Sequence, residues 1–127
     1  KQLIKHESPT INGDGSFSRD FTYIDNVIQM NILSMLTSNK DSINQIYNTA
    51  YGEQTTLIGL VDLLKSNLSK YDPKIKDVVI NFGPERLGDI PHSLASIEKA
   101  KKLLDYDPSY CIRSGLEHAI DWYYKNL

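Results

Sequence analysis

The sequence has 127 residues and a mass of 14.4 kDa, the length of one domain with a single modest core. The formal net charge is −2, so neither sign dominates as it does in proteins that bind nucleic acid or acidic membranes. No apolar run approaches the roughly 18 residues of a spanning helix, and no signal peptide is visible. The single cysteine, Cys111, cannot form an internal disulfide, which favours a reducing compartment. We therefore expect a cytoplasmic protein without nucleic-acid or membrane partners. Because the first residue is Lys1 rather than Met, we also expect it to be part of a longer protein.

The predicted elements alternate between strands and helices. In chain order they are the end of a helix (1–7), a glycine-rich turn (13–16), a strand (19–24), a helix (26–38), a strand (44–50), a helix (57–68), a strand (77–82), a long loop (83–95), a helix (96–104) and a terminal helix after Pro108. Asp25 and Thr56 precede two of the helices and are predicted to cap them. This alternation indicates an α/β fold.

Two patterns carry expectations about burial. The helix over 26–38 offers five apolar residues for burial: Val27, Met30, Ile32, Leu33 and Leu36. The strand over 77–82 has an unbroken apolar centre, which is typical of a strand buried on both faces.

The glycine-rich stretch before the first strand was tested against two ligand-binding motifs. A calcium-binding EF-hand loop fails, because Phe17 stands where glycine is required and Tyr23 where glutamate is required. A dinucleotide fingerprint also fails, because Gly13-x-Gly15 continues to Ser18 rather than glycine and leads into a strand. The stretch is therefore interpreted as a turn.

No catalytic set is evident from the residues alone. None of the eight tyrosines is followed four residues later by lysine, the pair that short-chain dehydrogenases use. Cys111 and His118 lie seven residues apart on one helical face, without a third group, and are interpreted as a buried thiol and a surface histidine. The three histidines have no metal-binding spacing.

Two arginines beside turns remain as candidates. Arg19 follows the glycine-rich turn, and Arg86 lies in the long loop, three residues before Asp89. A guanidinium can bind phosphate through two hydrogen bonds, and a carboxylate can hold sugar hydroxyls. The alternative is a solvated surface on which each arginine pairs with a neighbouring carboxylate: Asp20 or Asp25 for Arg19, and Glu85 or Asp89 for Arg86.

Four segments resemble a known family. They are "INGDGSFSRDFTYIDNVIQMNIL", "IYNTAYGEQTTL", "GPERLGDIPHSLASIEKAKKLLDYDP" and "GLEHAIDWYYKNL". In this order they are similar to the C-terminal part of extended short-chain dehydrogenases that act on nucleotide sugars. Within that family they look most like bacterial UDP-N-acetylglucosamine 4-epimerases of surface-polysaccharide synthesis. The resemblance implies that residues 1–127 form a nucleotide-sugar-binding domain with short strands and about four helices, without the Rossmann portion.

The resemblance also assigns roles to individual residues. Arg19 and Arg86 would clamp the UDP diphosphate, and Asp89 would accept hydrogen bonds from the uridine ribose. Ser93 matches a position that lines the sugar pocket, where a small side chain suits an N-acetylated hexosamine. For three further residues in family motifs, turn or strand-end roles are expected: Asn12, Asp14 and Asn48.

For the intact protein the resemblance implies an NAD-dependent isomerase and a homodimer that acts on a UDP-N-acetylhexosamine or UDP-hexose. NAD would take a hydride from sugar C4 while a tyrosine removes the hydroxyl proton, and the keto sugar would then rotate before the hydride returns. NAD and the Tyr-Lys pair belong to the family's N-terminal portion, so this chain alone is expected to be inactive. Two alternatives stay open. One is a nucleotide-sugar 4,6-dehydratase or a UDP-glucuronate decarboxylase or epimerase of the same family, and the other is a non-catalytic interaction domain.

Overall fold

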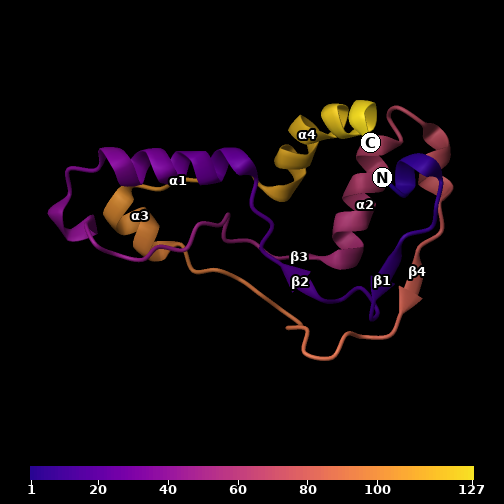
Figure 1. The fold of residues 1–127 in the computed structure, drawn as a ribbon, viewed down its shortest axis with the longest axis horizontal. Coiled ribbons are helices and arrows are strands. Elements are labelled where there is room, and N and C mark those ends of the chain that lie inside the picture. The colour runs from indigo at the N-terminus through magenta and orange to yellow at the C-terminus, as the bar shows by residue number, and fades with distance from the viewer.

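The computed structural model describes residues 1–127 as an elongated molecule with four α-helices and four short strands (Figure 1). The helices are α1 (Ile24–Leu36), α2 (Leu57–Leu68), α3 (Glu98–Leu104) and α4 (Ile112–Asn126). The strands are β1 (Thr10–Asn12), β2 (Ser18–Arg19), β3 (Thr55–Thr56) and β4 (Asn81–Gly83). Three short 3-10 helices complete the list: η1 (Leu3–Lys5), η2 (Lys40–Ser42) and η3 (Pro73–Asp77). None of the helices combines the length and apolar character needed to traverse a bilayer.

The molecule has two ends with separate hydrophobic cores. At one end α3 packs against α1 and η2, and at the other α2 packs against α4 and η3 (Figure 1). The core of the first end consists of Met30, Ala50, Ile97, Ala100, Leu104 and Tyr106. The core of the second consists of Leu3, Leu68, Ile75, Val78 and Ile120. β2 and β3 lie between the two ends, whereas β1 and β4 lie below α2 at the second end (Figure 1).

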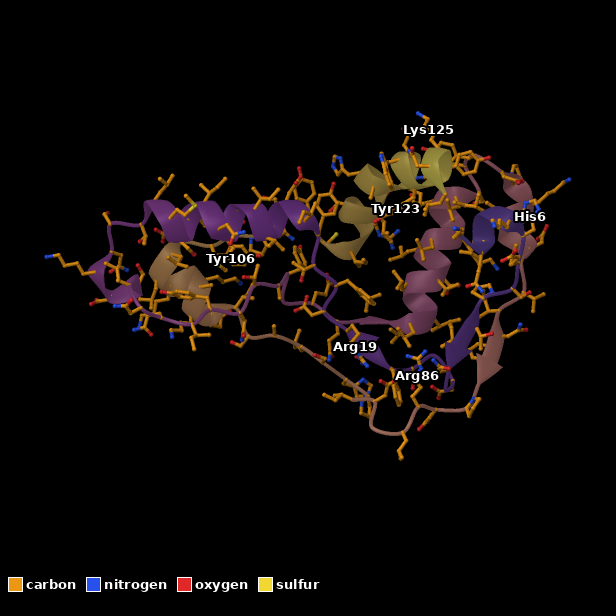
Figure 2. All side chains as sticks on the ribbon, viewed as in Figure 1. His6, Arg19, Arg86, Tyr106, Tyr123 and Lys125 are labelled. Carbon is orange, nitrogen blue, oxygen red and sulfur yellow. The ribbon has the colours of Figure 1, made fainter.

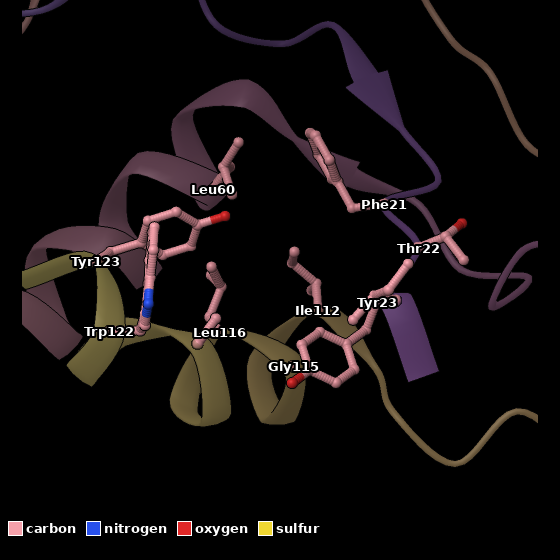
Figure 3. A pocket seen from close by; sticks show the side chains of 11 residues that line it. Phe21, Thr22, Tyr23, Leu60, Ile112, Gly115, Leu116, Trp122 and Tyr123 are labelled. Atoms are coloured by element: carbon pink, nitrogen blue, oxygen red, sulfur yellow. The ribbon is translucent and has the colours of Figure 1, made fainter. Parts of the chain in front are cut away.

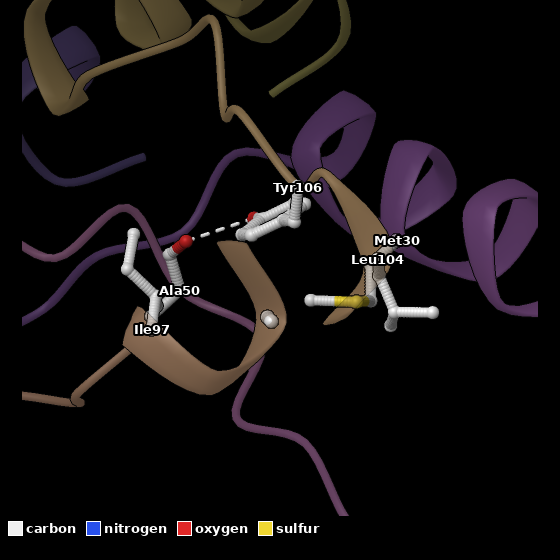
Figure 4. Packing of buried hydrophobic residues seen from close by; sticks show 6 residues of the cluster. Met30, Ala50, Ile97, Leu104 and Tyr106 are labelled. Atoms are coloured by element: carbon white, nitrogen blue, oxygen red, sulfur yellow. Dashed lines mark hydrogen bonds between the residues drawn. The ribbon is translucent and has the colours of Figure 1, made fainter. Parts of the chain in front are cut away.

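Tyr106 organises the first core (Figure 4). Its ring is buried and its hydroxyl donates a 2.8 Å hydrogen bond to the carbonyl oxygen of Ala50. This bond fastens the segment after α3 to the irregular segment before β3. Burial also raises the pKa of the Tyr106 hydroxyl, which keeps the donor protonated.

The strands form two small two-stranded sheets. β1 and β4 are parallel, with Asn12 opposite Gly83, whereas β2 and β3 are antiparallel, with Arg19 opposite Thr55. Ser18 also makes an isolated parallel bridge to His92 in the long loop. The parallel pairing brings the carboxyl ends of β1 and β4 to the same edge.

The α/β fold with short strands and four helices is confirmed, and the start of α2 is confirmed in detail. The Thr56 hydroxyl accepts a 3.1 Å hydrogen bond from the amide of Gly59, as an N-cap should. The predicted cap at Asp25 is wrong. Tyr23 occupies the N-cap of α1, without a side-chain cap, and Asp25 lies in the first turn, where its charge suits the helix dipole.

Three predictions about the strands need correction. Residues 44–50 form no strand, and β2 is limited to Ser18–Arg19 rather than 19–24. β4 begins only at Asn81 and pairs with β1 alone. The segment 77–82 is not buried on both faces, because Val79 and Phe82 are 66% and 56% exposed.

The burial predicted for α1 is correct for only part of the helix. Met30 is buried and Leu33 packs against the first core, but Ile32 and Leu36 are 50% and 76% exposed. α1 therefore has a covered face toward α3 and a second apolar face that nothing in the chain covers.

Candidate functional site

The glycine-rich turn leads from β1 to β2 and is fastened to the start of α2. Gly13 and Gly15 have φ values of 79° and 84°, a left-handed conformation that glycine adopts without strain. The carboxylate of Asp14 accepts a 2.8 Å hydrogen bond from the amide of Ser16, and the hydrogen bonds from Ser16 hold the pKa of Asp14 below its usual value. The carbonyl of Gly15 accepts from the amide of Ile58 in α2. The glycine-rich stretch is therefore a turn that leads into β2, and the turn predicted from the sequence is present.

Arg19 ends β2 with its guanidinium turned toward the long loop. Nη1 donates to the carbonyl oxygen of Ser18 at 2.8 Å and to that of Pro91 at 3.4 Å. Asp20, the expected surface partner, instead accepts hydrogen bonds from the amides of Tyr51 and Gly52. Arg19 thus makes no ion pair with its neighbour in sequence.

Arg86 lies on the other side of this region, just after β4 (Figure 2). Its guanidinium lies against the side-chain amide of Asn12. Because a guanidinium only donates, the amide is assigned with its oxygen toward Arg86, where it accepts from Nε at 2.9 Å and from Nη2 at 3.3 Å. Neither Arg19 nor Arg86 has a carboxylate oxygen within 4.0 Å. The ion pairs of the structure are His6–Asp72, Lys101–Glu98 and Lys125–Asp121. The geometry therefore does not match the alternative in which both arginines pair with neighbouring carboxylates.

The long loop that carries Arg86 returns to β2. The amide of Asp89 donates to the carbonyl of Arg86 at 3.2 Å, and Gly88 between them has a φ of 86°. Ser18 donates its amide to the carbonyl of Pro91 at 2.9 Å and accepts from the amide of Ser93 at 3.1 Å.

A side-chain contact completes this attachment. The hydroxyl of Ser18 is also 2.9 Å from Nδ1 of His92. The loop is therefore held at both of its ends, by Asn12 at Arg86 and by Ser18 at residues 91–93.

The four predicted site residues consequently belong to one region. Arg19 is half-buried in β2, whereas Arg86, Asp89 and Ser93 are exposed along the loop that crosses back to it. The side chains of Asp89 and Ser93 have no hydrogen-bond partner within the chain and are open to solvent. Asn12, assigned only a strand-end role from sequence, is the contact that the sequence analysis missed. Its partner lies 74 residues away, so no local pattern could have revealed it.

An apolar pocket of the structure lies elsewhere. It has a volume of about 480 Å³ and lies where the segment after β2 meets α2 and α4 (Figure 3). Its lining is apolar and aromatic, with Phe21, Tyr23, Leu60, Trp122 and Tyr123 among its side chains. None of the predicted site residues lines it, and it offers no charged group to a phosphate.

Cys111 and His118 do not act together. The Cys111 thiol is 3.5 Å from the hydroxyl of Ser114, and this hydrogen bond lowers the pKa of the thiol. His118 packs against the ring of Tyr110, with ring centres 5.1 Å apart. The thiol is only partly buried, and no nucleophile–base pair is present at this position.

Known proteins are similar to this chain over its whole length. No family model matches the sequence. The UDP-glucuronate 4-epimerase of Thermodesulfobacterium geofontis is 33% identical over 128 residues, which cover 100% of this chain and 36% of that protein. The chain thus spans little more than a third of the length of this curated relative.

Solved structures are similar to this chain over nearly the same length. The UDP-glucose 4-epimerase of Thermotoga maritima with UDP-glucose has a TM-score of 0.82 and 30% identity, covering 98% of this chain and 37% of that one. The UDP-glucuronic acid 4-epimerase of Bacillus cereus, in complex with UDP-glucuronic acid and NAD, has a TM-score of 0.80 and 33% identity, with the same coverage. A UDP-N-acetylglucosamine 4-epimerase of Methanobrevibacter ruminantium with UDP-N-acetylmuramic acid has a TM-score of 0.74 and 29% identity, covering 95% of this chain and 38% of that one. Over nearly its whole length the chain therefore matches the C-terminal part of nucleotide-sugar 4-epimerases of the extended short-chain dehydrogenase/reductase family.

Proposed function

We propose that this chain is the UDP-sugar-binding part of an NAD-dependent 4-epimerase that acts on a nucleotide sugar in surface-polysaccharide synthesis. The observation that carries the proposal is the pair of arginines, Arg19 and Arg86, which share one loop-bounded region and have no carboxylate partner. Guanidinium groups that are not neutralised are suited to a diphosphate, which they can bind through charge-assisted hydrogen bonds.

Asp89 and Ser93 extend the proposed site along the loop. The Asp89 carboxylate has no partner in the chain and can accept hydrogen bonds from the hydroxyls of a ribose. Ser93 attaches the loop to Ser18 through its amide and presents a small side chain beside the place we assign to the sugar. In this arrangement the nucleotide is held firmly while the sugar keeps room to turn, which epimerisation at C4 requires. Binding energy from the non-reacting nucleotide then supports the reaction at the sugar.

We place NAD on the part of the relatives' length that this chain does not span. The glycine-rich turn supports this placement, since it leads into β2 rather than into a helix N-terminus, where a dinucleotide phosphate would bind. A Cβ on Gly15 would also lie 3.1 Å from the Ile58 side chain, so this glycine is explained by packing against α2. The residues of this chain thus do not fit a dinucleotide site, and its role is to bind the substrate.

The proposal is tested by calorimetric titration of UDP into the natural protein that carries this chain. Arg19→Ala and Arg86→Ala should each weaken binding by roughly 1.5–3 kcal/mol, the scale of a hydrogen bond to a charged group, or about 10- to 150-fold in Kd. Arg113→Ala is the matched control, because this exposed arginine lies on α4 beside Asp62 and Ser66 of α2. Equal, small changes in all three variants would reject the proposed clamp.

The role of Ser93 is tested by Ser93→Tyr. A tyrosine ring beside the sugar would occupy the space that an N-acetyl group needs, so kcat/KM should fall more for UDP-N-acetylglucosamine than for UDP-glucose. A pocket that rejects an added group discriminates by about 10- to 200-fold, which sets the expected ratio. Equal losses for both sugars would indicate general damage to the loop and would reject the pocket assignment.

A further inference from the structure

Asn12 stands where the two chain segments of the proposed site meet. It is the last residue of β1, opposite Gly83 of β4, and the amide of the next residue, Gly13, donates a 2.9 Å hydrogen bond to the Gly83 carbonyl. Arg86 follows three residues after Gly83. The parallel register of β1 and β4 therefore fixes the distance between Asn12 and the start of the loop.

The contact between Asn12 and Arg86 has a defined direction. A guanidinium has only donors, so the amide of Asn12 must turn its oxygen toward Arg86, where it accepts from Nε at 2.9 Å and from Nη2 at 3.3 Å. These two bonds occupy one edge of the guanidinium. The edge formed by Nη1 and the remaining Nη2 hydrogen stays free, and it carries the parallel donors that bind a phosphate oxygen pair.

The contact is also uncharged on the Asn12 side. An aspartate at this position could hold the guanidinium in the same way, but it would neutralise the arginine and repel a nearby phosphate. An amide oxygen orients Arg86 and leaves its positive charge available.

We propose that Asn12 is a positioning residue, which orients Arg86 toward the diphosphate of a nucleotide sugar without touching that ligand. The inference rests on the proposed function, since it assigns Arg86 to the diphosphate. Asn12 reduces the rotamer freedom that Arg86, an exposed and flexible side chain, would otherwise lose on binding. Its contribution to affinity therefore exists only while Arg86 is present.

A double-mutant cycle tests this dependence. UDP is titrated into the natural protein carrying this chain and into three variants: Asn12→Ala, Arg86→Ala and the double variant. We expect Asn12→Ala to weaken UDP binding about fivefold, the scale of immobilising one rotamer-rich side chain on binding. In the Arg86→Ala background the same change should have no further effect.

The other outcomes of the cycle separate this inference from the proposed function. A loss from Asn12→Ala that is the same in both backgrounds, or no loss in either, would overturn the positioning role and leave the arginine clamp intact. An Arg86→Ala variant with unchanged UDP affinity would overturn both.

Asn12→Asp gives a second measurement that does not depend on how well the alanine variant folds. Aspartate is as suitable as asparagine at a strand end and keeps an acceptor oxygen toward Arg86, so a purely structural role predicts unchanged UDP binding. Our proposal predicts a loss of about three- to tenfold that diminishes as salt is added, because the new charge is screened. Unchanged affinity of Asn12→Asp at low salt would contradict the proposal.

Discussion

Replacing Gly115 with alanine should destabilise the protein, although alanine is the better helix former. Gly115 is buried in α4, and a Cβ there would lie 2.9 Å from three atoms at the root of the Tyr23 ring. Ordinary carbon contacts are roughly 3.5–4.0 Å, so the helix or the ring must move by about half an ångström. Overpacking of this kind costs about 1–3 kcal/mol, whereas the gain in helix propensity is about 1 kcal/mol. Since the contacting atoms cannot swing aside as a side-chain tip could, the cost should exceed the gain, and we expect a net loss of up to about 2 kcal/mol.

The assay is equilibrium unfolding in urea, with a control on the same helix. Glu117 is exposed two residues further on, so the difference between Glu117→Ala and Glu117→Gly measures the propensity term alone. If Gly115→Ala stabilised the protein by as much as that control difference, the Tyr23 ring would have yielded without cost. The reasoning from the close contact would then be refuted.

Three further predictions concern other parts of the chain. The hydrogen bond from His6 lowers the pKa of Asp72, so this carboxylate stabilises the folded state above its ordinary pKa of 3.8 and loses that contribution as the pH falls through the lowered value. The stability difference between the wild type and Asp72→Asn, measured by urea unfolding, should accordingly vanish in acid. The lowered pKa of Cys111 predicts alkylation by iodoacetamide at a lower pH than for a free thiol, and Ser114→Ala should move the midpoint of the pH–rate profile upward. Finally, Met35 is 81% exposed on the uncovered face of α1, so Met35→Lys should reduce self-association in sedimentation without lowering Tm.

Local signals were sufficient where a residue acts on its own stretch of backbone. Thr56 caps α2 through the amide of Gly59, three residues away, and this bond forms in any context that allows the helix. α4 was likewise predicted from the apolar spacing of Ile112, Leu116 and Ile120. Such features were readable from the sequence because their partners lie within one or two helical turns.

The segment 44–50 shows why the strand predictions failed. Its composition favours a strand, but its last carbonyl finds a distant side chain instead of a neighbouring strand. The carbonyl of Ala50 accepts from the Tyr106 hydroxyl, and just beyond the segment the amides of Tyr51 and Gly52 donate to Asp20. Because buried backbone groups must be paired but not in any particular way, propensity alone could not decide between a ladder and these contacts.

The candidate site shows the same difference between features with local signals and features with distant partners. Arg19 and Arg86 were selected from the sequence as arginines beside turns, and the structure brings both to one loop. Asn12 was missed because its contact with Arg86 depends on the register of a parallel strand pair. Parallel pairing joins segments that are far apart in sequence, and a single sequence contains no record of which residues it places opposite one another.

The apolar face of α1 marks the limit of what patterns within one chain can decide. α1 carries apolar residues around most of its circumference, which is typical of a helix that is buried on all sides. α3 covers Met30, whereas Ile24, Ile28 and Ile32, spaced four residues apart, remain 59%, 47% and 50% exposed. The pattern therefore specified correctly that these side chains favour burial, and it could not specify what would cover them. The chain spans 36% to 37% of the length of three of the 4-epimerases that it matches. No part of the 127 residues covers this face, which is why a helix predicted correctly in type was predicted incorrectly in exposure.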